Sequence, residues 1–164
     1  MTDSVSVNID GLAEVLGKFE AIEYDLKKKG GRFALRKAAQ LVRNKARQNA
    51  EAIDDPETDA NIAKNIVERW SGRTFKRTGD LMFRVGVMGG AGGSATSASL
   101  DGLPGKDTRH WRYKEFGTED IAATPFMRRA LADNITAAIN EFGDQYEKKM
   151  NRAIKAAKKK AGVQ

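Results

Sequence analysis

Residues 111–131 read WRYKEFGTEDIAATPFMRRAL, and this stretch decides how we expect the second half of the chain to fold. Aromatic side chains fit the pleated, half-buried surface of a sheet, and three of them occupy its first six positions: Trp111, Tyr113 and Phe116. Gly117 follows at once and can adopt the positive φ angles with which a strand stops and reverses. The first part of the stretch therefore predicts a strand over 109–116 that ends in a sharp turn.

The second part of the same stretch carries a helix start. The Thr124 side chain can accept a hydrogen bond from an early backbone N–H, and Pro125 follows at the position where its missing N–H costs nothing. From there the chain reads as helix almost to its end, because apolar residues recur mostly every four positions: Leu131, Ile135, Ala138, Phe142, Tyr146, Met150, Ala153 and Ala157. We expect one long C-terminal helix, with a bend or an end at Gly143.

The first half of the chain is expected to begin with a strand and two amphipathic helices. The alternating SVSVNI motif near the N-terminus predicts a strand over 5–9. Apolar residues then recur at helical spacing over 11–28 and over 32–52. A glycine pair at 30–31 separates the two stretches, and we expect it to end the first helix.

The middle of the chain is expected to change from helix to strand. Asp54-Asp55-Pro56 predicts the start of a third helix, whose apolar stripe consists of Ile62, Ile66 and Trp70. After Ser71-Gly72 the apolar period changes from 3.6 to 2, which predicts a strand over 81–88. A short partner strand is expected at 74–76.

Residues 89–108 (GGAGGSATSASLDGLPGKDT) have no apolar period and consist largely of Gly, Ser and Ala. Such a stretch buries too little apolar surface to offset the entropy lost when it is ordered. Two interpretations are open. The stretch is either a flexible arm that joins two strands, or an arm that becomes ordered only against a neighbouring subunit.

Together these patterns predict an α+β fold in which a small antiparallel sheet packs against the N-terminal helices and a long C-terminal helix. The sheet is expected to contain residues 5–9, 74–88 and 109–116. We expect residues 1–144 to form a single domain that carries the flexible arm 89–108. Residues 145–164 are expected to form a basic helical extension.

Composition argues against an enzyme. The chain of 164 residues is long enough for one domain with a sizeable core, but it contains no cysteine and only one histidine, His110. A Ser-His-Asp arrangement would depend on that residue alone, and on the expected strand His110 and Glu115 would point to opposite faces. No apolar run approaches the length that crosses a membrane. We therefore expect no catalytic residue, no cofactor, no metal site and no membrane partner.

Two suggestive motifs are better explained by structure. The glycines at 86–93 lack the Gly-Lys-Ser/Thr ending of a phosphate loop. The acids at 54–59 lack the central Gly and closing Glu of a calcium loop, and charge compensation at a helix N-terminus explains them better. Glu115, just before the turn, is expected to be structural, because its carboxylate can accept from exposed backbone N–H groups.

The positive charge of the chain is concentrated in residues 145–164. They contain seven Lys or Arg and one acid, which gives +6 of the total net charge of +7. Such a tail could contact DNA without reading its sequence, contact an acidic protein surface, or form a solvated helix face. The candidate contact residues are Lys148, Lys149, Arg152, Lys155, Lys158, Lys159 and Lys160.

Two spaced motifs carry a family resemblance. The EFGT motif at 115–118 and TPFMRRAL at 124–131 resemble the "EFGT … PF(L/M)RPAL" signature of tail-completion, or head–tail joining, proteins from the neck of long-tailed bacteriophages. Residues 34–46 and 54–66 resemble other family segments, so the resemblance covers residues 9–142, with Arg129 where many members carry Pro. The residues that carry the fold and assembly motif are Glu115, Phe116, Gly117, Thr118, Pro125, Phe126 and Leu131.

This resemblance implies a virion structural protein that is assembled in the host cytoplasm and located in the tail or neck. Six copies would form a ring between the head connector or stopper and the tail terminator or tail tube, and phage DNA would pass through it. A tail terminator that caps the tube is the related alternative. The alternative from another class is a non-specific nucleic-acid-binding protein that uses the basic tail.

Overall fold

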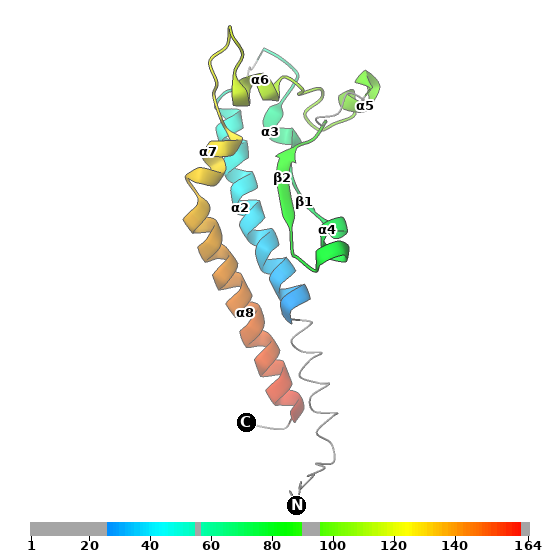
Figure 1. Ribbon diagram of the computed structural model, residues 1–164, viewed down its shortest axis with the longest axis vertical. Helices are drawn as coiled ribbons and strands as arrows, with labels where there is room; N and C mark the ends of the chain where they lie inside the picture. The colour runs from blue at the N-terminus through cyan, green and yellow to red at the C-terminus, as the bar shows by residue number, and fades with distance from the viewer. Residues whose placement is uncertain (1–25, 55–56, 90–95, 162–164) are drawn as a thin grey trace, which may run out of the picture.

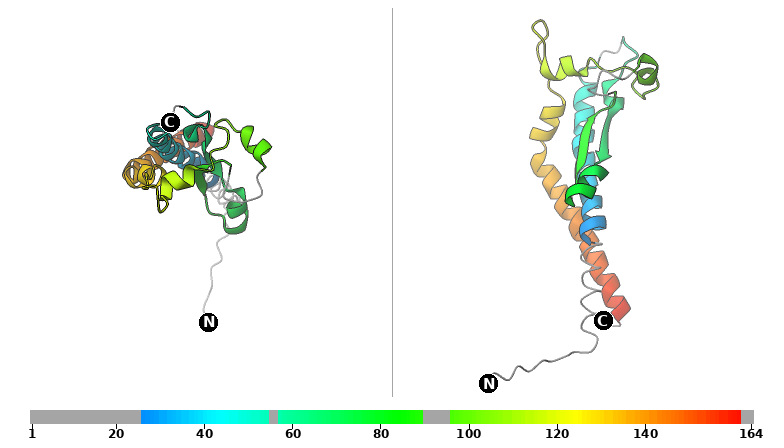
Figure 2. Two further views of the ribbon diagram at one scale, coloured as in Figure 1. Left: turned by 90° about the horizontal axis from the view of Figure 1, so that it is seen from above. Right: turned by 45° about the vertical axis from the view of Figure 1, so that its right-hand side comes forward.

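The computed structural model describes residues 26–54, 57–89 and 96–161, apart from the side chains of residues 97, 160 and 161. Two long helices, α2 (Gly31–Glu51) and α8 (Ile135–Ala161), run antiparallel and side by side (Figure 1). The strands β1 (Ile66–Trp70) and β2 (Phe83–Val87) lie along the other side of α2 from α8 (Figure 2). The predicted α+β fold, with a small antiparallel sheet and a long C-terminal helix, is confirmed.

Helix α2 is the centre of this arrangement because its inward positions carry small side chains. Its buried residues are Gly31, Ala34, Ala38, Ala46 and Ala50, and such residues let neighbouring backbones approach closely. The predicted helix over 32–52 is confirmed within one residue at each end. The ribbon of two strands covers one side of α2, and α8 covers another.

The glycine pair before α2 does not end a helix, so that prediction is wrong. The π-helix η1 (Leu26–Gly30) continues directly into α2, and the backbone of Gly30 is helical, with φ −66° and ψ −52°. A Cβ on Gly31 would lie 2.7 Å from the Leu81 side chain, and one on Gly30 would lie 3.6 Å from the Tyr146 ring. These glycines therefore serve close packing. Most of the predicted helix over 11–28 lies outside the described residues.

The third helix is much shorter than expected. Helix α3 spans only Ile62–Asn65, and Asn61 caps it by accepting from the backbone N–H of Lys64. From Ile66 the backbone is extended and enters β1. The helical spacing of Ile62, Ile66 and Trp70 was therefore misleading, because pairing with β2 overrides a short local pattern.

The two strands form an antiparallel ribbon in which Ile66 lies opposite Val87 and Trp70 opposite Phe83. The predicted strand over 81–88 is confirmed as β2. The partner strand expected at 74–76 is wrong, because these residues lie in helix α4 (Gly72–Thr78), which ends at Gly79 with φ +76°. The expected strand over 5–9 lies outside the described residues.

The strand expected over 109–116 is also wrong, because Trp111–Phe116 form the short helix α6. In this helix Trp111 and Glu115 share one face, four residues apart. Glu115 is buried and Trp111 half-buried, whereas Tyr113 and Phe116 are exposed. The aromatic residues fit this helix because its two faces have different environments.

Beyond Pro125 the described part of the chain forms two helices rather than the single one expected. Helix α7 (Met127–Ala132) precedes α8, and the chain turns between them at Asp133 and Asn134. Asn134 donates a side-chain hydrogen bond to the carbonyl of Ala130 across this break. Gly143 does not end a helix, because α8 continues through it.

The compact core lies where α2, α3, β1 and α7 meet. It consists of Ala46, Ala50, Ile62, Ala63, Ile66, Phe126 and Ala130. This core joins segments that are far apart in the sequence, so it holds the start of the C-terminal helices against the centre of the molecule. No helix in the described part of the chain is long and apolar enough to cross a membrane.

Candidate assembly interface

Glu115 connects the two halves of the 111–131 stretch. Its side chain is 1% exposed and accepts from the backbone N–H groups of Phe126, Met127 and Arg128 at 2.8, 2.9 and 3.0 Å. The Arg128 guanidinium also donates to the same carboxylate at 3.1 Å. These N–H groups belong to the first turn of α7, where backbone donors have no partner within the helix and negative charge is favoured.

Thr124 does not cap α7, contrary to the prediction. Its backbone N–H and its hydroxyl both donate to the carbonyl of Lys114, at 2.7 and 3.3 Å. Because α7 begins at Met127, two residues beyond Pro125, the Thr124 side chain is too early in the chain to reach the free N–H groups. Instead, the carboxylate of Glu115, from the preceding helix α6, accepts from the N–H groups at the start of α7.

The loop over residues 117–124 is held in one shape. Gly117 has φ +76°, and a Cβ there would lie 2.8 Å from the carbonyl oxygen of Ile121. Thr118 closes the loop, because its N–H donates to the Ile121 carbonyl at 2.9 Å and its hydroxyl accepts from the N–H of Ile121 at 3.0 Å. The loop projects beyond the end of α2 (Figure 1).

The predicted motif residues have different environments. Phe126 is 1% exposed and belongs to the core, whereas Phe116 is 62% exposed and Leu131 51% exposed. Pro125 is half-buried and Thr118 is exposed. Glu115, Gly117 and Phe126 therefore shape the fold directly, and Phe116 and Leu131 present apolar surface. The role of these residues in assembly stays a prediction.

Several large apolar side chains are exposed on α6, the 117–124 loop and the C-terminal helices. Leu131, Ile135 and Ile139 follow one another at intervals of four, and each is at least half exposed; we call these three residues the apolar stripe. The expected continuous C-terminal face is half-buried only from Ala138 onward. Tyr113, Phe116 and Ile121 add exposed apolar surface near the loop.

The basic tail residues lie on α8, which runs through the expected boundary at residue 144 without interruption. Lys149 lies over the ring of Phe33 at 4.2 Å, so its stem and charge contribute to the contact with α2. The other tail residues with described side chains are exposed: Lys148, Arg152, Lys155, Lys158 and Lys159. The side chain of Lys160 lies outside the described residues.

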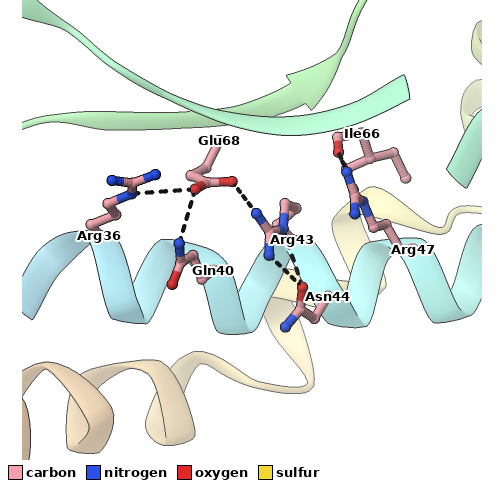
Figure 3. A network of polar contacts seen from close by, with 7 residues as sticks. All are labelled: Arg36, Gln40, Arg43, Asn44, Arg47, Ile66 and Glu68. Carbon is pink, nitrogen blue, oxygen red and sulfur yellow. Dashed lines mark hydrogen bonds and ion pairs between the residues drawn. The ribbon is translucent and has the colours of Figure 1, made fainter. Parts of the chain in front are cut away.

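A polar network joins α2 to β1, and sequence reasoning missed it (Figure 3). Glu68 accepts from Gln40 at 3.2 Å and pairs with Arg43, while Arg36 lies 3.5 Å away. Partial burial opposes its ionisation, but hydrogen bonds from Gln40, its own backbone N–H and Arg43 outweigh burial and lower the pKa of Glu68. The network was not visible in the sequence because Glu68 was expected on a helix.

Asn65 forms a second buried connection that sequence reasoning missed. Its side chain donates to the Lys106 carbonyl and the Thr108 hydroxyl at 2.9 and 2.8 Å, and accepts from the Gly105 N–H at 2.8 Å. A Cβ on Gly105 would lie 2.0 Å from the Asn61 carbonyl oxygen, so only glycine fits there.

This connection shows that part of the 89–108 stretch has a defined conformation; the flexibility of the arm stays a prediction. Residues 97–101 form helix α5 (Ser97–Asp101), Leu100 is buried, and the segment up to Thr108 is held against Asn65. Burial of Leu100 and the hydrogen bonds of the buried Asn65 amide stabilise this half of the stretch. Residues 90–95 lie outside the described residues.

Among the residues that the structure describes, no set of side chains resembles a catalytic or metal site. His110 precedes α6, and Asp107 pairs with Arg109 at 2.6 Å. Within the described ranges, no three His, Asp or Glu side chains lie close enough to hold a metal ion. What the geometry offers is therefore a surface for contacts with other macromolecules.

Comparison with known proteins gives one match. A family model described as "Bacteriophage HK97-gp10, putative tail-component" matches residues 13–117, which is more than half of the chain. The matched region includes Glu115, Phe116 and Gly117 and ends before Pro125. No curated protein sequence and no solved structure matches the chain.

Proposed function

Because the chain belongs to the HK97-gp10-like family of bacteriophage tail components, we propose that it is a subunit of the tail-completion ring in the neck. The sequence resemblance to phage tail proteins is confirmed by this membership. The protein is a structural component of a phage tail, so it is located in the virion and contacts other virion proteins. The family is structural rather than catalytic in character.

In the proposed ring, six copies lie between the head connector and the tail tube, and DNA passes through the centre. The observation that supports this proposal is the apolar stripe on α7 and α8. Soluble monomers rarely expose contiguous apolar side chains of this size, whereas protein interfaces bury them. Ile135 and Ile139 lie one turn apart on α8, and Leu131 is exposed on α7 just before the turn, so exposed apolar side chains follow one another along the start of the C-terminal helices, which suits contact with a neighbouring subunit.

The test compares subunit assembly with a matched pair of substitutions. Ile135→Asp with Ile139→Asp places two charges on the apolar stripe, and Thr136→Asp with Asn140→Asp places the same charges at exposed neighbouring positions of α8. All four substitutions keep similar helix propensity. Light scattering and electron microscopy should show rings for the wild type and the control pair, and monomers with an unchanged melting temperature for the stripe pair.

The position in the virion is tested separately. A tagged copy should be found at the head–tail junction of purified particles by electron microscopy, and phage lacking the protein should accumulate unjoined heads and tails. Location at the tube end with normal joining would favour the tail terminator. Absence from purified particles, together with salt-sensitive duplex binding that requires Lys155, Lys158 and Lys159, would favour the nucleic-acid-binding alternative.

A further inference from the structure

The outer face of the β1–β2 ribbon carries opposed arginine side chains. Glu68 points toward α2 (Figure 3), and side chains alternate along a strand, so Val67 and Arg69 point away from α2. Arg69 lies directly opposite Arg84 in the strand register. Like charges at opposed positions destabilise a ribbon, and within the described residues neither arginine has an acidic partner.

A groove runs along this outer face. Arg73, at the start of α4, adds a third guanidinium to its wall, and Leu103 adds an apolar side chain. Gly86 lies opposite Val67, and no atom lies within 4 Å of the position that a Cβ on Gly86 would take. We call this surface the arginine groove; it consists of Val67, Arg69, Arg73, Arg84, Gly86 and Leu103.

The 117–124 loop has the complementary chemistry. Glu119 and Asp120 are exposed neighbours at its end, and Ile121 beside them is 47% exposed. In the described part of the chain neither acid forms an ion pair. Because the hydrogen bonds of Thr118 fix the loop, docking it would cost little conformational entropy.

We propose that the 117–124 loop of one copy inserts into the arginine groove of the next copy, with Glu119 and Asp120 against Arg69 and Arg84 and Ile121 against the apolar lining. This inference rests on the proposed ring. The groove faces away from α2, and the loop projects beyond the end of α2 (Figure 1). The contact therefore joins different copies, and a repeated contact between two different surfaces generates a ring when its rotation closes.

Duplex DNA is the main competing occupant, and the groove fits it less well. Phosphate contacts use the positive charge but gain nothing from the apolar side chains of Val67 and Leu103. A loop that carries two carboxylates and an isoleucine can contact both the arginine side chains and the apolar side chains of the groove. Guanidinium–carboxylate pairs are also directional, so they fix the register of one copy on the next.

Disulfide trapping tests the contact, because the natural chain contains no cysteine. Gly86→Cys and Asp120→Cys are made in separate chains, one of them tagged, and the proteins are mixed and oxidised. A disulfide requires Cα atoms about 4.4–6.8 Å apart, so efficient 86–120 dimers require the proposed docking. A chain with Lys64→Cys, an exposed residue outside both surfaces, replaces the Asp120 variant as the control.

Charge reversal tests the chemistry of the same contact. Arg69→Glu with Arg84→Glu on the Gly86→Cys chain should lower the yield of 86–120 dimers about tenfold or more, because carboxylates would then face each other. Glu119→Arg on the Asp120→Cys chain should restore most of the yield. Lys45→Glu with Lys64→Glu reverses the same amount of charge elsewhere and should change the yield less than twofold.

The outcomes separate this inference from the proposed function. Rings without 86–120 dimers would overturn the docking of the loop and leave the ring intact. Monomers at all concentrations without cross-links would overturn both. The third outcome is that no 86–120 dimer forms and the protein binds duplex DNA. If the double variant Arg69→Gln with Arg84→Gln then loses this binding, the groove is assigned to DNA. The inference is supported if 86–120 dimers form, if Arg69→Glu with Arg84→Glu lowers their yield, and if Glu119→Arg on the other chain restores it.

Discussion

Replacing Glu115 with alanine should lower the free energy of unfolding by about 2–5 kcal/mol. The change removes the acceptor of three backbone N–H groups in the first turn of α7. The N–H of Phe126 is fully buried, and leaving a buried donor unpaired costs about 1–3 kcal/mol. The N–H groups of Met127 and Arg128 are partly buried and add about 0.5–1 kcal/mol each, within the range known for lost helix caps.

The ion pair with Arg128 adds little to this magnitude, because the arginine side chain is 59% exposed. Urea unfolding should show a lower midpoint with an unchanged slope, and the melting temperature should fall by about 5–15 °C for a chain of this size. Glu115→Gln should cost less, about 1–2 kcal/mol, because one amide oxygen can still accept while the NH2 group faces a donor.

The matched control is Glu119→Ala, which removes a carboxylate from the exposed loop four residues later. It should change the free energy of unfolding by less than about 0.5 kcal/mol. Equal stability of the Glu115→Ala and Glu119→Ala variants would refute the reasoning, because it would mean that the α7 N–H groups find water or other partners at no cost.

Further predictions concern the same elements. Phe126→Ala should cost about 3–5 kcal/mol in urea unfolding, whereas Leu131→Ala should cost less than about 1 kcal/mol, because only the first side chain is buried. Gly117→Val should lower the melting temperature, because a β-branched residue at φ +76° is strained by at least about 1–3 kcal/mol and its Cβ would meet the Ile121 carbonyl. The lowered pKa of Glu68 means that its ionised form stabilises the fold above its ordinary value of 4.5, and that this contribution is lost as the pH falls below 4.5 toward the folded-state pKa. Glu68→Gln should therefore flatten the dependence of stability on pH below 4.5, measured by urea midpoints. Truncation after Asp144 tests our proposal that residues 1–144 form the folded unit: the core should persist, but hydrogen exchange should increase in the first turns of α2, which lose the contacts made by Tyr146 and Lys149.

Several parts of the candidate surface could be predicted from sequence. Gly117 has the positive φ that was expected from the sequence. Glu115 accepts from backbone N–H groups, as was also expected. What the sequence did not reveal is which N–H groups Glu115 reaches, because they belong to the start of α7, which begins twelve residues later. The arginine groove was equally hidden, since Arg69 and Arg84 are fifteen residues apart and become neighbours only through the strand register.

The amino-acid sequence by itself determined the long helices with a sustained pattern: α2 with its alanines and most of α8. Over many residues, small local preferences add up and one period wins. Only the tertiary structure decided the short segments. Residues 66–70 became a strand because β2 pairs with them, and residues 111–116 became a helix whose Glu115 caps α7. In segments of five or six residues the local preference is small, so a few hydrogen bonds and buried contacts with distant parts of the chain determine the conformation.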